Sequence, residues 1–198
     1  MKCYSNPRHA PAANPYPDKA GGIGDFSYDT ALVLLRLRDA PEMRSGEDAD
    51  YLTGQPYQVS WTDDAADVHQ IVVPAGMITD LTSVPWGFRL LVGRVGPWLE
   101  AAIVHDYLYL AWADVPGRGN RQADRAFADL LMRVAMEKAR VSLWRRWAIY
   151  LALRAFGAGA YGRTSDQRFV DLHDPAVRKQ LYAGGPPLSD ARPALPLV

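Results

Sequence analysis

The apolar segment AAIVHDYLYLAW, residues 101–112, has a titratable pair at its centre, His105 and Asp106, followed one helical turn later by Tyr109. A polar or charged group in such a segment is costly to bury unless a nearby group satisfies it. A neutral imidazole can take a proton from water, and a carboxylate behind it fixes the tautomer and stabilises the imidazolium that forms. These residue types predict a general base, His105, that needs a carboxylate partner.

The expected partner is Asp124, in the stretch RQAD at 121–124. Two helical patterns are joined by the short connection ADVPGRG, so the helices should pack antiparallel. This packing brings the N-terminal half of the second helix, with Asp124, toward the C-terminal half of the first, where His105 and Tyr109 lie. We therefore expect Asp124 to orient His105. The alternative is that Asp124 and Arg121, three positions apart on one helix, form an ordinary surface pair.

A second group of oxygen ligands predicts a metal site. Asp106 projects about 100° around the helix from His105, so the two side chains face different neighbours. Asp80 lies in the stretch TDLTSVP, in a loop ahead of a proline. If Asp80 approaches Asp106, the two carboxylates and a loop carbonyl such as that of Leu81 form a site that suits calcium or magnesium. The alternative is that TDLTSVP is only a turn that caps a short helix.

The elements that position these residues indicate an α+β fold, with a small antiparallel β region followed by a bundle of three main helices. From Phe26 to about Thr79, the stretches TALVLLRLR, PYQVSWT and DVHQIVVPAGMI favour three or four antiparallel strands. Farther along the chain, apolar residues recur at helical spacing. Helices are expected over about 96–112, 120–139 and 141–156.

A single domain is expected over 25–160, with its β region at 25–80 and its helical region at 85–160. Residues 1–24 are rich in proline and lack periodicity, so we expect an extended arm that either stays mobile or docks on a partner. Residues 161–198 are expected to form a polar, proline-rich tail with at most a short helix near DPAVRKQLYA.

Charge and cysteine content exclude several classes of protein. The 22 basic and 22 acidic residues cancel, so no whole-chain field draws the protein onto nucleic acid or an anionic membrane. Arginines of the third helix, such as Arg145 and Arg146, are expected to form a solvated face over an aromatic core with Trp144 and Trp147. DNA binding through these arginines is the weaker alternative. A single cysteine, Cys3, allows neither an internal disulfide nor a thiolate zinc site.

The sequence shows no pattern typical of a signal peptide or a transmembrane helix. The N-terminal stretch lacks the apolar core of a signal peptide, and nowhere do about eighteen uncharged apolar residues run together. We therefore expect synthesis in the cytoplasm and no transmembrane segment.

Three ordered motifs span the predicted domain. They are Asp80-x-Thr82-Ser83-x-Pro85, His105-Asp106-x-Leu108-Tyr109 and Arg121-x-x-Asp124-x-x-Phe127, with RAFG following at 154–157. Together they resemble an uncharacterised family of small proteins encoded by bacteriophages and prophages, over about residues 25–160. The resemblance implies a phage origin. Partners among other phage or virion proteins would then be contacted through the arm and the tail, because segments that cannot fold alone often order on neighbouring subunits.

The segment AAIVHDYLY followed by ADRAF is similar to the paired active-site helices of phospholipase A2, in which a His-Asp-x-x-Tyr helix packs on a helix that carries Asp-Arg-Ala. The resemblance implies that His105 is the general base, Asp106 a calcium ligand and Asp124 the partner of His105. It also implies that Tyr109 donates a hydrogen bond to Asp124, and that Asp80 is a second calcium ligand.

Two functions from different classes are expected. The first is a metal-assisted hydrolase, in which His105 activates water against an ester held beside a calcium-like cation. Its substrate class is a phospholipid of the host envelope or, with the same residues, a peptidoglycan bond. The second is a structural or assembly component of the virion tail, neck or baseplate, without catalysis. A structural cluster should be fully buried and paired, whereas an enzyme should hold its base at an open cleft.

Overall fold

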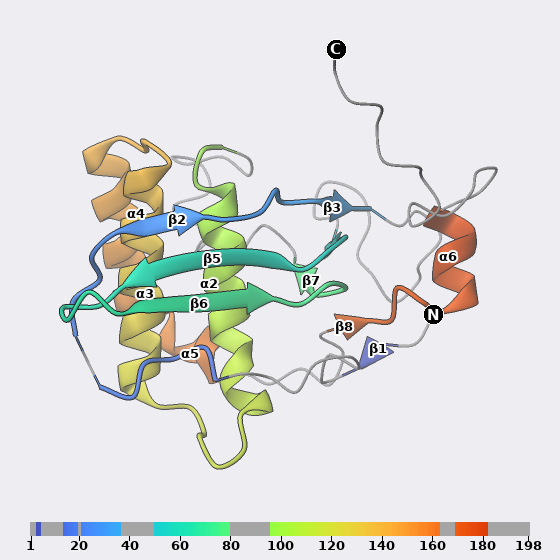
Figure 1. Ribbon diagram of the computed structural model, residues 1–198, viewed down its shortest axis with the longest axis horizontal. Helices are drawn as coiled ribbons and strands as arrows, with labels where there is room; N and C mark the ends of the chain where they lie inside the picture. The colour runs from blue at the N-terminus through green and yellow to red at the C-terminus, as the bar shows by residue number, and fades with distance from the viewer. Residues whose placement is uncertain are drawn as a thin grey trace.

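The computed structural model describes residues 3–4, 14–19, 21–36, 50–79, 96–162 and 169–181. These residues form an α+β fold of small antiparallel sheets and helices, as the sequence predicts (Figure 1). The strands are β1 (Cys3–Tyr4), β2 (Phe26–Tyr28), β3 (Leu34–Leu35), β4 (Tyr51–Thr53), β5 (Tyr57–Thr62), β6 (Val68–Val73), β7 (Ile78–Thr79) and β8 (Phe169–Val170). The helices are α2 (Leu99–Ala111), the 3-10 helix η2 (Trp112–Asp114), α3 (Gln122–Lys138), α4 (Leu143–Phe156), α5 (Ala158–Tyr161) and α6 (Pro175–Leu181).

The sheet with the longest strands has the order β2-β5-β6 and lies against α2 and α3 (Figure 1). Successive side chains of a strand point to opposite faces, so Tyr57, Val59 and Trp61 of β5 are all buried while the residues between them are half-buried. On β6, Ile71 and Val73 are buried in the same way. One face of this sheet therefore belongs to the core.

The other sheets have shorter strands, and one of them pairs residues near the start of the chain with residues that follow α5. Their strand orders are β3-β4-β7 and β1-β8. Strand β7 ends at Thr79, whose hydroxyl donates a hydrogen bond of 2.8 Å to Oδ2 of Asp106 on α2. The second sheet thus makes a direct polar contact with the helix that carries the candidate site.

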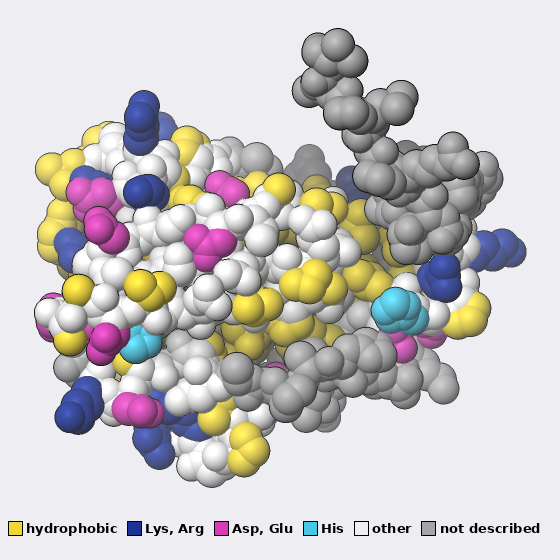
Figure 2. All heavy atoms as spheres, viewed as in Figure 1, with side chains coloured by type: hydrophobic (Ala, Val, Ile, Leu, Met, Phe, Trp, Pro, Cys, Tyr) yellow, Lys and Arg dark blue, Asp and Glu magenta, His cyan; other side chains and the backbone are white. Residues whose placement is uncertain are grey.

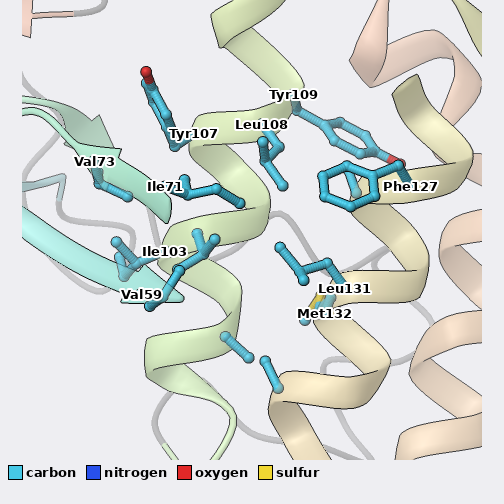
Figure 3. Packing of buried hydrophobic residues seen from close by; sticks show 14 of the residues in the cluster. Val59, Ile71, Val73, Ile103, Tyr107, Leu108, Tyr109, Phe127, Leu131 and Met132 are labelled. Carbon is cyan, nitrogen blue, oxygen red and sulfur yellow. The ribbon is translucent and has the colours of Figure 1, made fainter. Parts of the chain in front are cut away.

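Helix α2 is the centre of the core, because the main sheet covers one side of it and α3 the other. Figure 3 shows Ile103 of α2 among β-strand side chains and Leu108 facing the side chains of α3. Apolar residues consequently occur around most of the helix rather than on one stripe. Each large side chain buried in this way stabilises the fold by about 1.5–3 kcal/mol.

Part of the predicted N-terminal arm packs in the core of the domain itself. Tyr16 is buried, and its hydroxyl donates a hydrogen bond to the carbonyl of Leu108 on α2. The guanidinium of Arg118 lies 4.8 Å from the centre of the Tyr16 ring and donates to the carbonyl of Pro17. These contacts fix residues around Tyr16 against the connection between α2 and α3.

The predicted helices are found at α2, α3 and α4, and the short helix predicted in the tail is α6. The described residues between 26 and 79 form six strands, more than the three or four predicted, because strands of two or three residues are too short to show an alternating pattern. The pairing of β1 with β8 brings the two ends of the described chain together and was not predicted.

The expected orientation of α4 is wrong. Trp144 and Trp147, predicted to form an aromatic core, have 55% and 43% of their surface exposed, and Leu151 on the same face has 58% exposed. The buried residues of this helix are instead Ile149 and its neighbours Ala152 and Leu153. Helix α4 is apolar on two opposite faces, and the face with the smaller side chains is the one that packs against α3.

No helix among the described residues combines the length and the apolar character needed to cross a membrane.

We predict that Gly76→Ala lowers the free energy of unfolding by about 2–4 kcal/mol, measured by urea titration. Gly76 has a φ of +82°, and a Cβ at this position would press on the carbonyl oxygen of Val170. Gly117 also has a positive φ, of +73°, but a Cβ there meets nothing within 4 Å. Gly117→Ala is therefore the matched control and should cost about 1 kcal/mol. Equal losses in the two variants would contradict the close packing at Gly76.

Candidate functional site

A buried imidazole and a buried carboxylate form the centre of the candidate site. His105 on α2 has 3% of its surface exposed, and Asp129 on α3 is fully buried. Nε2 of His105 lies 3.0 Å from Oδ1 of Asp129. When Nε2 carries the proton and donates to this oxygen, Nδ1 of the neutral imidazole keeps a free lone pair. Asp129 is thus placed to fix the tautomer of His105.

Two further residues bind the Asp129 carboxylate. The hydroxyl of Tyr109 donates to Oδ1 at 2.6 Å, and Nη1 of Arg154 on α4 donates to Oδ2 at 2.9 Å. Figure 3 shows the Tyr109 ring pointing from α2 toward α3. A Cβ on Gly157 would lie 2.5 Å from the Tyr109 hydroxyl, so glycine at this position leaves room for that hydroxyl. The carboxylate of Asp129 therefore connects three helices.

Burial and hydrogen bonding act against each other on the two titratable groups. Burial disfavours the charged form of His105, but attraction from the Asp106 and Asp129 carboxylates outweighs it and raises the pKa of His105 above its usual value of 6.5. Burial also disfavours the ionised form of Asp129, yet its bonds with His105, Tyr109 and Arg154 lower its pKa. Burial and the nearby Asp129 charge raise the pKa of Tyr109, which stays a neutral donor.

Asp106 lies on the other side of the imidazole. Its Oδ1 is 4.0 Å from Nδ1 of His105, longer than a hydrogen bond, and its Oδ2 accepts the hydrogen bond from Thr79. The Asp106 side chain is 12% exposed, against 3% for His105. The Asp106 carboxylate, on the Nδ1 side, is therefore closer to solvent than the imidazole itself.

The expected pairing of Asp124 with His105 and Tyr109 is wrong. Asp124 instead accepts two hydrogen bonds from Arg118, at 2.6 Å from Nε and 2.7 Å from Nη2. Asp124 lies in the first turn of α3, beside the connection that carries Arg118. It is a buried, paired carboxylate at the end of the helix pair, one and a half turns from the residue that binds His105.

The register of the helix pair explains why Asp129 takes the position expected for Asp124. Residues equally far from the connection of an antiparallel helix pair lie opposite each other. His105 is six residues before the end of α2 at Ala111, and Asp129 is seven residues after the start of α3 at Gln122. Long side chains of a helix lean toward its N-terminus, which lets Tyr109 reach back to the same carboxylate.

Sequence reasoning missed Asp129, Arg154 and Gly157 as parts of the site. Counting outward from the connection would have found Asp129, an acidic residue within the apolar run AFADLLM. Arg154 and Gly157 belong to the stretch RAFG that follows the three motifs, and this stretch is the sequence signal that could have pointed to them.

Of the three predicted metal ligands, one is among the described residues. Asp106 is described, whereas Asp80 and Leu81 lie outside the described residues. Among the described residues, no group of three or more His, Cys, Asp or Glu side chains could hold a metal ion. Among the described residues, Asp106 supplies one carboxylate on the Nδ1 side of His105, so a cation would need further ligands such as Asp80 and the Leu81 carbonyl.

The fold and the site together define a small α+β protein with a buried imidazole–carboxylate cluster between helices. Residues 56–153 match the model of a family described as "Protein of unknown function (DUF1353)". The matched segment contains β5, β6, α2 and α3, and with them His105, Asp106 and Asp129. Searches of curated proteins and of solved structures gave no match.

We predict that the protein loses stability as the pH rises above about 6.5. The raised pKa of His105 means that the folded state binds more protons than the unfolded state, so stability is fully present below 6.5 and is lost as the pH passes the folded pKa. One such group gives a slope of at most about 1.4 kcal/mol per pH unit. Urea titrations from pH 5 to 9 measure this slope.

His105→Gln should remove the decline above pH 6.5. His69→Gln is the matched control, because it removes a half-exposed imidazole of β6 that pairs with Asp63 in the connection between β5 and β6, and the decline should remain. The lowered pKa of Asp129 acts in the opposite direction, so its stabilisation is present above about 3.8 and is lost as the pH falls through the folded value. A decline above pH 6.5 that persists in His105→Gln would refute the assignment to His105.

Proposed function

We propose that this protein is a hydrolase in which His105 is the general base and Asp129 orients it. The observation that carries the proposal is the geometry around the imidazole, with Nε2 3.0 Å from Asp129 and Nδ1 directed to the side of Asp106. The resemblance to phospholipase A2 implies a histidine, a partner aspartate and a tyrosine bound to that aspartate. Asp129 supplies the aspartate of this set in place of Asp124, with Tyr109 donating to it.

The chemistry follows from the free lone pair on Nδ1. Nδ1 takes a proton from water while the water oxygen attacks the carbonyl carbon of an ester. Asp129 stabilises the imidazolium that forms, and the imidazolium then returns the proton to the alkoxide as the ester C–O bond breaks. The products are a carboxylic acid and an alcohol, and no covalent intermediate with the protein is formed.

A cation would act on the Nδ1 side of the imidazole, beside Asp106. Asp106, with Asp80 and the carbonyl of Leu81, would hold a calcium ion, and a bound cation polarises the ester carbonyl and stabilises the oxyanion. Asp80 directly follows Thr79 in the sequence, and Thr79 bonds Asp106, which supports Asp80 as the second carboxylate. Ester bonds of host-envelope phospholipids are the proposed substrate class, in a protein of phage origin.

A structural role in the virion is the second candidate, and the burial of His105 and Asp129 favours it. A cluster that only fixes helix positions needs no route to solvent. In that case the protein is a component of the tail, neck or baseplate. Mass spectrometry of purified particles of the phage that encodes it should then detect the chain in stoichiometric amounts.

We predict that His105→Gln and Asp129→Asn each lower kcat/KM on a short-chain phospholipid by about 10²–10⁴-fold. In the wild type, kcat/KM should rise with pH through the ionisation of His105, because only the neutral imidazole accepts a proton. The measurement is release of fatty acid by the purified chain across a pH series, with circular dichroism to check folding.

Asp124→Asn discriminates between the two aspartates of α3. It leaves the His105–Asp129 pair intact, so the folded variant should keep most of the activity that Asp129→Asn loses. The reverse order of effects would contradict the pairing, and no hydrolysis of phospholipid or peptidoglycan by the wild type would leave the structural role as the better account.

We predict saturable calcium binding by calorimetry, weakened about tenfold or more in both Asp106→Asn and Asp80→Asn, because each removes a charged oxygen ligand. Asp63→Asn changes a carboxylate in the connection between β5 and β6 and should leave binding unchanged. Absence of binding at millimolar calcium would exclude a calcium-assisted mechanism.

A further inference from the structure

The outer face of α4 is an apolar surface that lies open to solvent. The large side chains Leu143, Trp144, Trp147 and Leu151 recur at three- and four-residue spacing, and each is exposed by 43% or more. Figure 2 shows hydrophobic side chains gathered at the left edge of the molecule, where α4 lies in Figure 1. Large contiguous apolar surfaces are rare on soluble proteins and mark sites of interaction.

Basic residues flank this surface. Residues 138–156 contain Lys138, Arg140, Arg145, Arg146 and Arg154, and no acidic residue. Arg146 pairs with Glu137, and Arg154 with Asp129. Among the described residues, Lys138, Arg140 and Arg145 form no ion pair. The protein is neutral as a whole but carries a local excess of positive charge here.

Arginine and tryptophan side chains lie together on this surface. The guanidinium of Arg133 is 4.8 Å from the centre of the Trp147 ring, and that of Arg145 is 5.2 Å from the Trp144 ring. Tryptophan prefers the boundary between water and hydrocarbon, and arginine keeps its charged head at the level of lipid phosphates while its stem covers apolar surface. The combination matches the chemistry of a bilayer surface.

We propose that α4 docks this protein on the surface of an anionic lipid bilayer. The helix is about 21 Å long, from 14 residues at 1.5 Å each, and would lie in the plane of the interface with its apolar face among the acyl chains. Lys138, Arg140 and Arg145 contact acidic head groups.

The positive charge near α4 argues against a second copy of the chain as the molecule that binds this apolar surface. A symmetric dimer through α4 brings the same surface of both copies together. Each copy contributes Lys138, Arg140 and Arg145, which form no ion pair with described residues, and residues 138–156 include no acidic residue, so like charges would meet across the interface. An anionic lipid surface supplies the opposite charge instead.

The test is sedimentation of the full chain with vesicles made of diether phosphatidylglycerol and diether phosphatidylcholine. Ether lipids have no ester bond, so binding is measured whether or not the protein hydrolyses phospholipids. We expect the wild type to bind vesicles rich in phosphatidylglycerol, to release them as salt is raised, and to show a blue shift of tryptophan fluorescence. Vesicles of phosphatidylcholine alone should bind weakly.

Three variants separate the contributions. Leu143→Gln with Leu151→Gln keeps good helix formers and should weaken binding by at least about tenfold. Arg140 has a φ of +57°, which asparagine tolerates, so Arg140→Asn removes one charge and should cost about fivefold at low salt. Val68→Thr with Val72→Thr alters exposed valines of β6 and should leave binding unchanged.

Three results would overturn the proposal. These are no binding of the folded wild type to anionic vesicles, equal binding by the Leu143→Gln/Leu151→Gln variant, or a dimer in light scattering that this variant alone converts to monomer. The last result would assign the surface to a second copy of the chain.

Discussion

The arrangement of the helices depends on the buried carboxylate of Asp129. An ionised carboxylate out of water is strongly destabilising unless charged or hydrogen-bonding groups pair with it. Its partners come from two other helices, with His105 and Tyr109 on α2 and Arg154 on α4. Apolar packing supplies most of the free energy of folding but tolerates small shifts between helices. The hydrogen bonds to Asp129 do not, so they select one register of α2, α3 and α4.

The same cluster links stability to the proposed chemistry. Because two carboxylates flank His105, the imidazolium is the form that the folded protein stabilises. A general base must be neutral, so the form that would accept a proton from water is the less stable one. When the pH rises through the pKa of His105, the stability of the fold therefore falls while the fraction of neutral, reactive imidazole rises. Such opposition is common where a fold holds a reactive group in place.

The fold was more predictable from the sequence than the site. Helical periodicity extends over many residues, and it located α2, α3 and α4 to within three residues at each end. Predicting the site required knowing which residues of α2 and α3 lie opposite each other. The short motif at Asp124 favoured that residue as the partner of His105, whereas the register of the two helices selects Asp129. Periodicity also says which residues share a helix face but not which face is buried. For α4, whose two opposite faces are both apolar, the bulkier residues were therefore assigned to the core incorrectly.

Helix α4 joins the proposed membrane surface to the buried cluster. Arg154 is three residues from Leu151 and is one-third exposed, so among the described partners of Asp129 it is the one that also reaches the outer surface. Lipid phosphates at this surface offer Arg154 a second acceptor. If Arg154 turns toward them, Asp129 keeps the hydrogen bonds with His105 and Tyr109 and the more distant Arg125, whose Nη1 is 4.0 Å from Oδ2. The carboxylate then interacts more strongly with the imidazole, and docking at α4 would raise the basicity of His105 without any lipid reaching it.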